Sequence, residues 1–215
     1  MIAVLAGDII KSSRLTPEEL QNVKDCIANT CDELREKFPH FGLSQLFFFR
    51  GDGWQMVIQK PSASLHVALS IYAALRHQNI AQTRIAIGVG NYDVLDMDSL
   101  DKSSGSVFSE VGHTLDNMTS RSRDIVFARR DFEKETAIRV GLWGITSCVS
   151  AIASDWTSRQ AQIAYIAMQR VDETRASLAE ILDPPITPQA FTDSLVSSHF
   201  AALSDGISAY FTILE

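Results

Sequence analysis

The stretch Leu46–Ile58 constrains the fold of this chain most strongly. Its two ends are apolar runs rich in aromatic and β-branched residues, and Gly51-Asp52-Gly53 lies between them. Two such runs around an Asp-Gly pair predict a β-hairpin with buried strands and an acidic turn. The flanking glycines allow a positive φ and the close approach of another group. Asp-Gly is also ordinary turn chemistry, so this stretch alone leaves a structural and a functional interpretation of Asp52 open.

The N-terminus repeats the pattern of a carboxylate at the end of an apolar strand. Residues 2–6 predict a buried strand, and Gly7-Asp8 follows directly. Two carboxylates at strand ends suit oxygen-preferring metal ions that carry a polyphosphate. Asp8 and Asp52 are therefore the candidate metal ligands and the candidate catalytic residues.

Composition excludes several classes of protein. The 19 Lys and Arg against 26 Asp and Glu give a net charge of −7, so sequence-independent binding to nucleic-acid phosphates is not expected. We find no run of about 18 apolar residues that would predict a membrane-spanning helix. The apolar start lacks the basic region and cleavage site of a signal peptide. Three cysteines without metal-ligand spacing fit a reducing cytoplasm, so we expect a cytoplasmic protein with no membrane partner.

The order of elements predicts an α+β fold. A capping box from Thr16 to Glu19 begins a helix after the first strand, and a second helix follows the hairpin from Ser62 or Ser64. Residues 83–90 then predict another strand. The order strand, helix, hairpin, helix, strand predicts a ferredoxin-like βαββαβ sheet with helices on one face. In that arrangement Asp8 and the hairpin turn meet at one end of the sheet.

Two further segments could face a ligand. Lys11, Ser12 and Ser13 form a polar loop between a strand and a helix, which could hold phosphate oxygens or could simply be a solvated connection. Gly88 and Gly90 alternate near the end of the strand 83–90. This spacing predicts a backbone pressed against a ligand or a neighbouring strand.

The second half of the chain changes to a helical pattern, in which Thr157 to Gln160 form a second capping box. A third helix from Gly105 and a short strand over 124–128 come first. His113 on that helix could be a general base, but a single histidine with no visible partner is more often structural. We divide the chain into a first domain, 1–135, and an all-α domain, 136–215. In the second domain a short helix, a Pro-Pro turn and a capped helix form a helix-turn-helix-like layout.

The charge of this segment argues against DNA binding. Residues 151–215 hold three Arg and no Lys against eight Asp or Glu. The second helix of the layout offers uncharged or acidic side chains, namely Gln189, Thr192, Asp193 and Ser194. A packing or dimerisation module is favoured, and a DNA-binding or dimeric regulatory protein is the alternative function.

Together, Gly7-Asp8-Ile9-Ile10, Gly51-Asp52-Gly53 and residues 84–90 resemble the motifs of a class III nucleotidyl cyclase catalytic domain. More closely, the chain resembles the bacterial SatD family, which joins a minimal cyclase-like domain to a C-terminal winged-helix segment. The first motif, continuing to Ser12-Ser13-Arg14, is one residue longer than in that family. Residues 105–108 are similar to the family's Gly-Pro-Ala-Phe, and the resemblance covers nearly the whole chain.

The resemblance implies a set of site residues. In class III cyclases the two strand-end aspartates bind two divalent ions, helped by the backbone carbonyl after the first. Carried over, this implies Asp8, Ile9 and Asp52 as ligands of Mg²⁺ or Mn²⁺, with a nucleoside triphosphate as partner. Phosphate binding would fall to Lys11, Ser12 and Ser13. The candidate substrate contacts are Gln55, Arg84, Asn117 and Arg121.

The chain also departs from the cyclase pattern. Active cyclases carry an Asn and an Arg on the helix after the fourth strand, and Asn117 and Arg121 have that spacing but fall near the helix end. No clear base-selecting Lys and Asp pair is visible. The resemblance thus implies a metal-dependent, nucleotide-binding, cyclase-like protein that is either an active nucleotidyl cyclase or a degenerate one. Because class III sites lie across a dimer, it also implies a homodimer.

Overall fold

The computed structural model describes residues 1–119, 123–129 and 136–215. In this part of the chain, five strands form one mixed sheet in the order β2-β3-β1-β4-β5. Neighbouring strands are antiparallel except β4 and β5, which are parallel. The strands are β1 (Ile2–Ile9), β2 (Phe47–Phe49), β3 (Gly53–Ile58), β4 (Thr83–Gly90) and β5 (Ile125–Phe127). The helices are α1 (Pro17–Lys37), α2 (Ser64–Gln78), α3 (Ser106–Asp116), α4 (Ala137–Ser154), α5 (Ser158–Gln169), α6 (Arg175–Glu180), α7 (Pro188–Ser197) and α8 (Phe200–Leu214).

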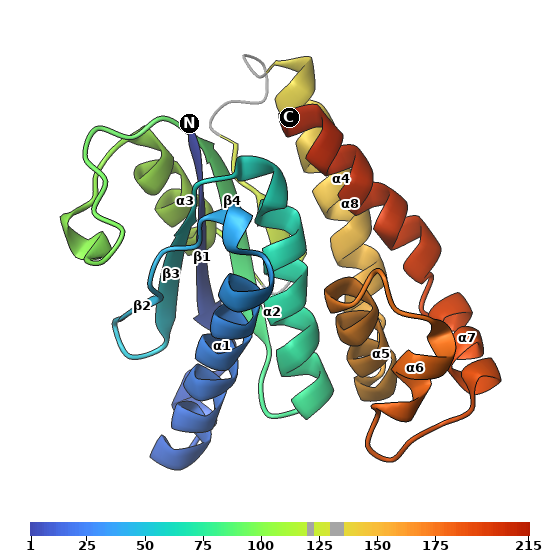
Figure 1. Cartoon of the computed structure of the whole chain (residues 1–215). Helices are drawn as coiled ribbons and strands as arrows, with labels where there is room; N and C mark the ends of the chain where they lie inside the picture. The colour runs from blue at the N-terminus through green and yellow to red at the C-terminus, as the bar shows by residue number, and fades with distance from the viewer. Residues whose placement is uncertain (120–122, 130–135) are drawn as a thin grey trace.

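The central strand β1 is apolar from Ile2 to Ala6 because both faces of the sheet are covered there (Figure 1). Successive side chains of a strand point to opposite faces. One set joins the core under α1 and α2, and the other joins the core under α3; these sets are Ala3, Leu5 and Ile9, and Ile2, Val4 and Ala6. The two helices of the expected βαββαβ unit, α1 and α2, lie on one face, and α3, which follows that unit, covers the second face.

Helix α3 also explains the glycines of β4. A Cβ on Gly88 would lie 2.2 Å from Val111 Cγ2, and one on Gly90 would lie 3.3 Å from Val107 Cβ. Close approach was expected at these positions, but the approaching group is a helix rather than a ligand or a strand.

The hairpin differs from its expected form in one strand. β3 is buried, whereas Phe47, Phe48 and Phe49 of β2 are each only half-buried. The reason is topological, because β2 is the edge strand of the sheet and packs against one neighbour.

Two predicted helix starts are confirmed. Thr16 and Glu19 form the capping box of α1, and Thr157 and Gln160 form that of α5. In each, side chains satisfy backbone N–H groups that the first helical turn leaves without partners.

The C-terminal helices lie beside α2 and β5, on the side of the molecule away from β2 (Figure 1). α4 contacts β5 and α8, and α5 contacts α2. By length and composition α4 is apolar enough to cross a membrane, which the sequence did not lead us to expect because Thr146, Ser147 and Ser150 interrupt its apolar positions. Leu142 and Val149 of α4 lie in the same hydrophobic core as β1, and 28% of the helix is buried.

Helices α6 and α7 form a small unit around their own cluster. Leu178, Leu182 and Phe191 are buried together with Ile163 of α5. On α7, the Gln189 side chain donates to Asp193 at 2.8 Å. A role of this unit in DNA binding stays a prediction.

Candidate functional site

Asp8 lies at the end of β1, between the two neighbouring strands. It pairs with Gly53 of β3 on one side and with Arg84 of β4 on the other. The preceding residue must be glycine, because a Cβ on Gly7 would lie 2.4 Å from ring carbons of Trp54 and 2.7 Å from the carbonyl oxygen of Arg84. The Trp54 ring therefore crosses β1 at Gly7.

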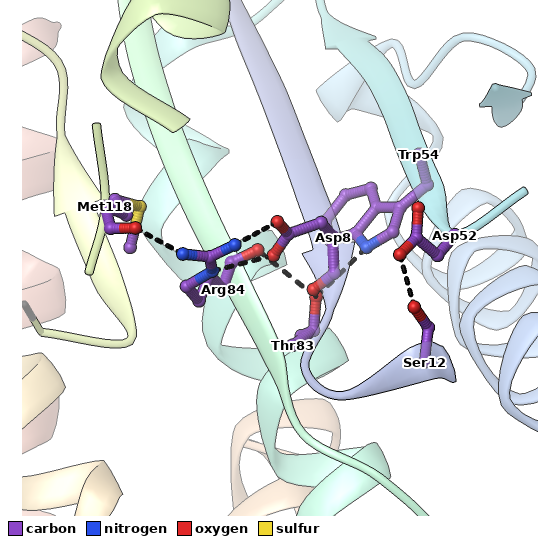
Figure 2. Close-up of polar contacts among 7 residues, drawn as sticks. All are labelled: Asp8, Ser12, Asp52, Trp54, Thr83, Arg84 and Met118. Atoms are coloured by element: carbon purple, nitrogen blue, oxygen red, sulfur yellow. Dashed lines mark hydrogen bonds and ion pairs between the residues drawn. The ribbon is translucent and has the colours of Figure 1, made fainter. Parts of the chain in front are cut away.

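This crossing holds the backbone of Asp8. Trp54 Nε1 donates to Thr83 Oγ1 at 3.1 Å, and Thr83 Oγ1 donates to the carbonyl oxygen of Asp8 at 2.8 Å (Figure 2). Trp54 and Thr83 are fully buried, so the hydrogen bond between their side chains is shielded from water. The relay links three strands and fixes the position from which the Asp8 side chain projects.

The hairpin turn brings Asp52 to the same end of the sheet. Arg50 and Gly51 take positive φ values of 50° and 89°, which turns the chain sharply before Asp52. The Ile9 N–H donates to the Asp52 carbonyl oxygen at 3.2 Å, so the turn is tied to the end of β1. A Cβ on Gly53 would lie 2.6 Å from the ring of Phe49, so that half-buried ring would have to shift if the residue were larger.

Asp8 and Asp52 line one open hollow of about 580 Å³. This volume lies in the range of small-molecule sites. The hollow also takes in the predicted metal and phosphate residues that follow Asp8. Its described lining consists of Asp8, Ile9, Ile10, Lys11, Ser12, Ser13, Asp52, Gln82, Arg84, Thr119 and Asp124.

The loop after β1 presents a hydroxyl to the acidic turn. Lys11 takes a positive φ of 58°, and Ser12–Arg14 form a single 3₁₀ turn. Ser12 Oγ donates to Asp52 Oδ2 (Figure 2). Ser13 and Lys11 are exposed at the rim of the hollow.

Arg84 forms the closest charged contact of the site. Its Nε donates to Asp8 Oδ1 at 2.9 Å, and its Nη2 donates to Asp8 Oδ2, so the guanidinium spans both carboxylate oxygens. Its Nη1 donates to the carbonyl oxygen of Met118 (Figure 2). The hydrogen bonds to Asp8 and the charges of Asp8 and Asp52 raise the pKa of Arg84 above its ordinary value.

The other predicted substrate contacts are placed differently. Gln55 is paired with Ala6 and Phe47 inside the sheet, and it is not among the residues that line the hollow. Asn117 caps the end of α3, where its Nδ2 donates to the His113 carbonyl at 2.7 Å, and it too is absent from the lining. Arg121 lies outside the described residues.

Asp124 was not singled out from the sequence as a site residue. It lies just before β5, where its carbonyl accepts from the Ile85 N–H at 2.7 Å and its Oδ2 accepts from Tyr72 Oη at 2.7 Å. Burial, followed by the hydrogen bond to Asp124, raises the pKa of Tyr72. The available signal was a carboxylate beside a short apolar strand, the pattern that identified Asp8.

The oxygen donors that line the hollow are of the type that binds divalent cations. Within residues 1–119, 123–129 and 136–215, no group of three or more His, Cys, Asp or Glu could hold a metal ion. The lining includes three carboxylates, those of Asp8, Asp52 and Asp124, which do not form such a group, and Asp124 already accepts from Tyr72. Asp8, Asp52 and the Ile9 carbonyl remain as candidate oxygen donors. Mg²⁺ is commonly held by one or two carboxylates together with substrate phosphates, so an ion here would need ligands from a bound phosphate or from water.

No family model and no curated protein matches the sequence. Solved structures match over part of the chain. The crystal structure of the guanylyl cyclase Cya2 is 19% identical, with a TM-score of 0.40, over 55% of this chain and 70% of that one. A bacterial light-regulated adenylyl cyclase is 14% identical, with a TM-score of 0.44, over 59% and 74%. At these values the similarity does not assign the chain to a family.

Proposed function

We propose that this protein binds a nucleoside triphosphate together with Mg²⁺ or Mn²⁺ in the hollow at the end of β1. One observation carries the proposal: Asp8 and Asp52, from two separate segments, line the same hollow as the polar loop that follows β1. Carboxylates suit the cations, and hydroxyl and ammonium groups suit the phosphates that such cations accompany.

Each group has a role in this proposal. Asp8, Asp52 and the Ile9 carbonyl hold the cation, which when bound would neutralise phosphate charge and polarise a reacting oxygen. Lys11, Ser12 and Ser13 lie at the rim, where they can meet phosphate oxygens. Arg84 is a second cationic contact for the same anion.

We further propose that the chain is a cyclase-like protein of SatD type that binds its nucleotide. It is either an active nucleotidyl cyclase or a degenerate one. Asn117 is not among the residues that line the hollow, which favours binding without turnover. The proposed division is a nucleotide-binding part, 1–135, and a helical part, 136–215, in a cytoplasmic homodimer. Light scattering tests the dimer, which should have about twice the 23.7 kDa mass of the chain.

Titration calorimetry tests the binding site. A non-hydrolysable nucleoside triphosphate with Mn²⁺ should bind the wild-type chain and should bind Asp8→Asn and Asp52→Asn at least about tenfold more weakly, equivalent to about 1.4 kcal/mol. Asn keeps the shape of each side chain and removes its charge. Asp93→Asn, on an exposed loop outside the hollow, makes the same charge change and should bind like the wild type. Equal affinities in all four proteins would overturn the proposal.

A further inference from the structure

The guanidinium of Arg84 is paired with the Asp8 carboxylate, which the proposed cation needs as a ligand. Both oxygens of Asp8 accept hydrogen bonds from Arg84, through Nε and Nη2. Ionised Arg and carboxylate groups form their strongest contact in this two-point arrangement. The side chains are 27% and 24% exposed, so solvent screens the pair only in part.

The two carboxylates proposed as metal ligands, Asp8 and Asp52, are in different electrostatic situations. Asp52 accepts from a neutral hydroxyl, that of Ser12, and a hydroxyl can turn to donate elsewhere. Asp8 is paired with a permanent cation, which cannot lose its charge by deprotonation in a protein. A metal ion that approaches both carboxylates therefore competes with a resident positive charge at Asp8.

Arg84 is also held from its other side. Its Nη1 donates to the Met118 carbonyl, in the segment that follows α3. The guanidinium thus bridges β1 to this segment, and its contacts hold it beside Asp8 (Figure 2). Arg84 itself lines the hollow, so a guanidinium released from Asp8 would move into the adjacent part of the hollow.

We propose that Arg84 is a built-in counter-cation that closes Asp8 in the metal-free protein and leaves Asp8 when a divalent cation binds. This inference rests on the proposed metal site and describes its regulation. A cation alone must displace the guanidinium, whereas an anion in the hollow offers Arg84 an alternative partner. The proposal therefore gives positive coupling between metal and anion at one site, with the same factor in both directions.

The coupling has a measurable size. When a competent state is only partly populated, the apparent dissociation constant is the intrinsic one divided by the competent fraction. If the pair is open about one tenth of the time, removing Arg84 tightens binding of the cation about tenfold.

Calorimetric titration with Mn²⁺ alone tests the proposal without measuring activity. Wild type should bind Mn²⁺ weakly, and Arg84→Gln should bind it at least about tenfold more tightly. Arg84→Lys keeps the charge but loses the two-point contact, so its affinity should lie between these values. Lys102→Gln, exposed and outside the hollow, makes the same change in net charge as Arg84→Gln and should match the wild type.

The outcomes separate this proposal from the metal site itself. Equal, measurable Mn²⁺ affinities in wild type and Arg84→Gln would overturn the counter-cation and leave the metal site standing. Weaker binding by both Arg84 variants, with thermal melting unchanged, would also overturn the counter-cation. No binding of Mn²⁺ to any of the proteins would overturn the metal site as well. Adding inorganic triphosphate should tighten Mn²⁺ binding to wild type more than to Arg84→Gln, and an equal effect on both would contradict the coupling.

Discussion

Gly7 and Gly51 serve different purposes beside the two aspartates. Around Gly51 there is open space, and its left-handed φ of 89° is what favours glycine there. Around Gly7 there is no space, because the Trp54 ring and the Arg84 carbonyl occupy the position of a Cβ. Gly7 is therefore a packing requirement for the relay that holds Asp8.

Gly7→Ala should destabilise the fold by about 1–3 kcal/mol, because the added methyl group has to displace a buried ring or strand backbone. Urea denaturation measures this directly as a lower midpoint. Gly112→Ala is the matched control, since Gly112 lies in α3 with nothing within 4 Å of its Cβ position. That change should stabilise the helix by about 0.5–1 kcal/mol or be neutral. A midpoint for Gly7→Ala equal to that of wild type would contradict the steric argument.

Some features of the site depend on the sequence of a single segment, and others depend on how distant segments pack together. The placement of Asp8 and Asp52 at one end of the sheet could be predicted because each stands at the end of its own apolar run. The contact between Arg84 and Asp8 depends on the register of β4 against β1, which a single sequence does not specify. The relay from Trp54 to Thr83 depends on two strands that flank a third, so it could not be predicted either.

At the scale of elements, capped helix starts were the best-predicted features because their signals are local. The capping boxes of α1 and α5 each lie within four consecutive residues. The exposure of β2 and the coverage of the second face by α3 depend on the order of strands in the sheet. The burial of β2 was mispredicted and the face covered by α3 was not predicted, since periodicity within one segment does not show which segment lies at an edge.

The junction between α1 and α2 should make the fold sensitive to acid. His66 of α2 lies with its ring centroid 5.4 Å from that of Phe38 and 5.8 Å from that of Phe41. Burial lowers its pKa to about 4 from the ordinary 6.5. The unfolded chain therefore takes up a proton near pH 6.5, whereas the folded chain resists protonation until about pH 4. Stability from this residue is fully present above pH 6.5 and declines as the pH falls toward 4.

His66→Leu should remove this acid sensitivity. We expect the free energy of unfolding of wild type to fall by roughly 1–3 kcal/mol more than that of His66→Leu between pH 7.5 and 4.5. Urea midpoints at the two pH values measure the difference. His113→Gln, at an exposed position of α3, should follow the wild type. An identical fall in wild type and His66→Leu would contradict a buried neutral imidazole.

The unit of α6 and α7 should not bind DNA in the full chain. Its cluster of Leu178, Leu182 and Phe191 accounts for the compact packing, and residues 151–215 carry three Arg against eight acidic residues. Binding to phosphates gains its strength from release of counterions by Lys and Arg. A gel-shift titration at two salt concentrations should show no salt-sensitive complex. A complex that weakens steeply with salt would instead support the regulatory alternative.

At the scale of the whole molecule, the two predicted domains share one hydrophobic core. Leu5 of β1 and Leu69 of α2 belong to the same buried cluster as Leu142, Leu203 and Tyr210 of the helical part. Ser64 and Tyr210 also share a buried hydrogen bond of 2.9 Å between α2 and α8. The division at residue 135 marks a change in sequence pattern, whereas the packing crosses it.

A shared core predicts that the chain unfolds in one transition. Near- and far-ultraviolet circular dichroism should give coincident urea curves, as expected when no intermediate is populated. A fragment of residues 1–135 should fail to fold cooperatively, because it would leave the helix-facing side of α2 exposed to water. Tyr210→Phe removes one buried hydroxyl and should lower the single midpoint, by about 1 kcal/mol in free energy, without splitting the transition. Two separate transitions would show that the helical part is an independent domain. A fragment of residues 1–135 that folds cooperatively would show the same.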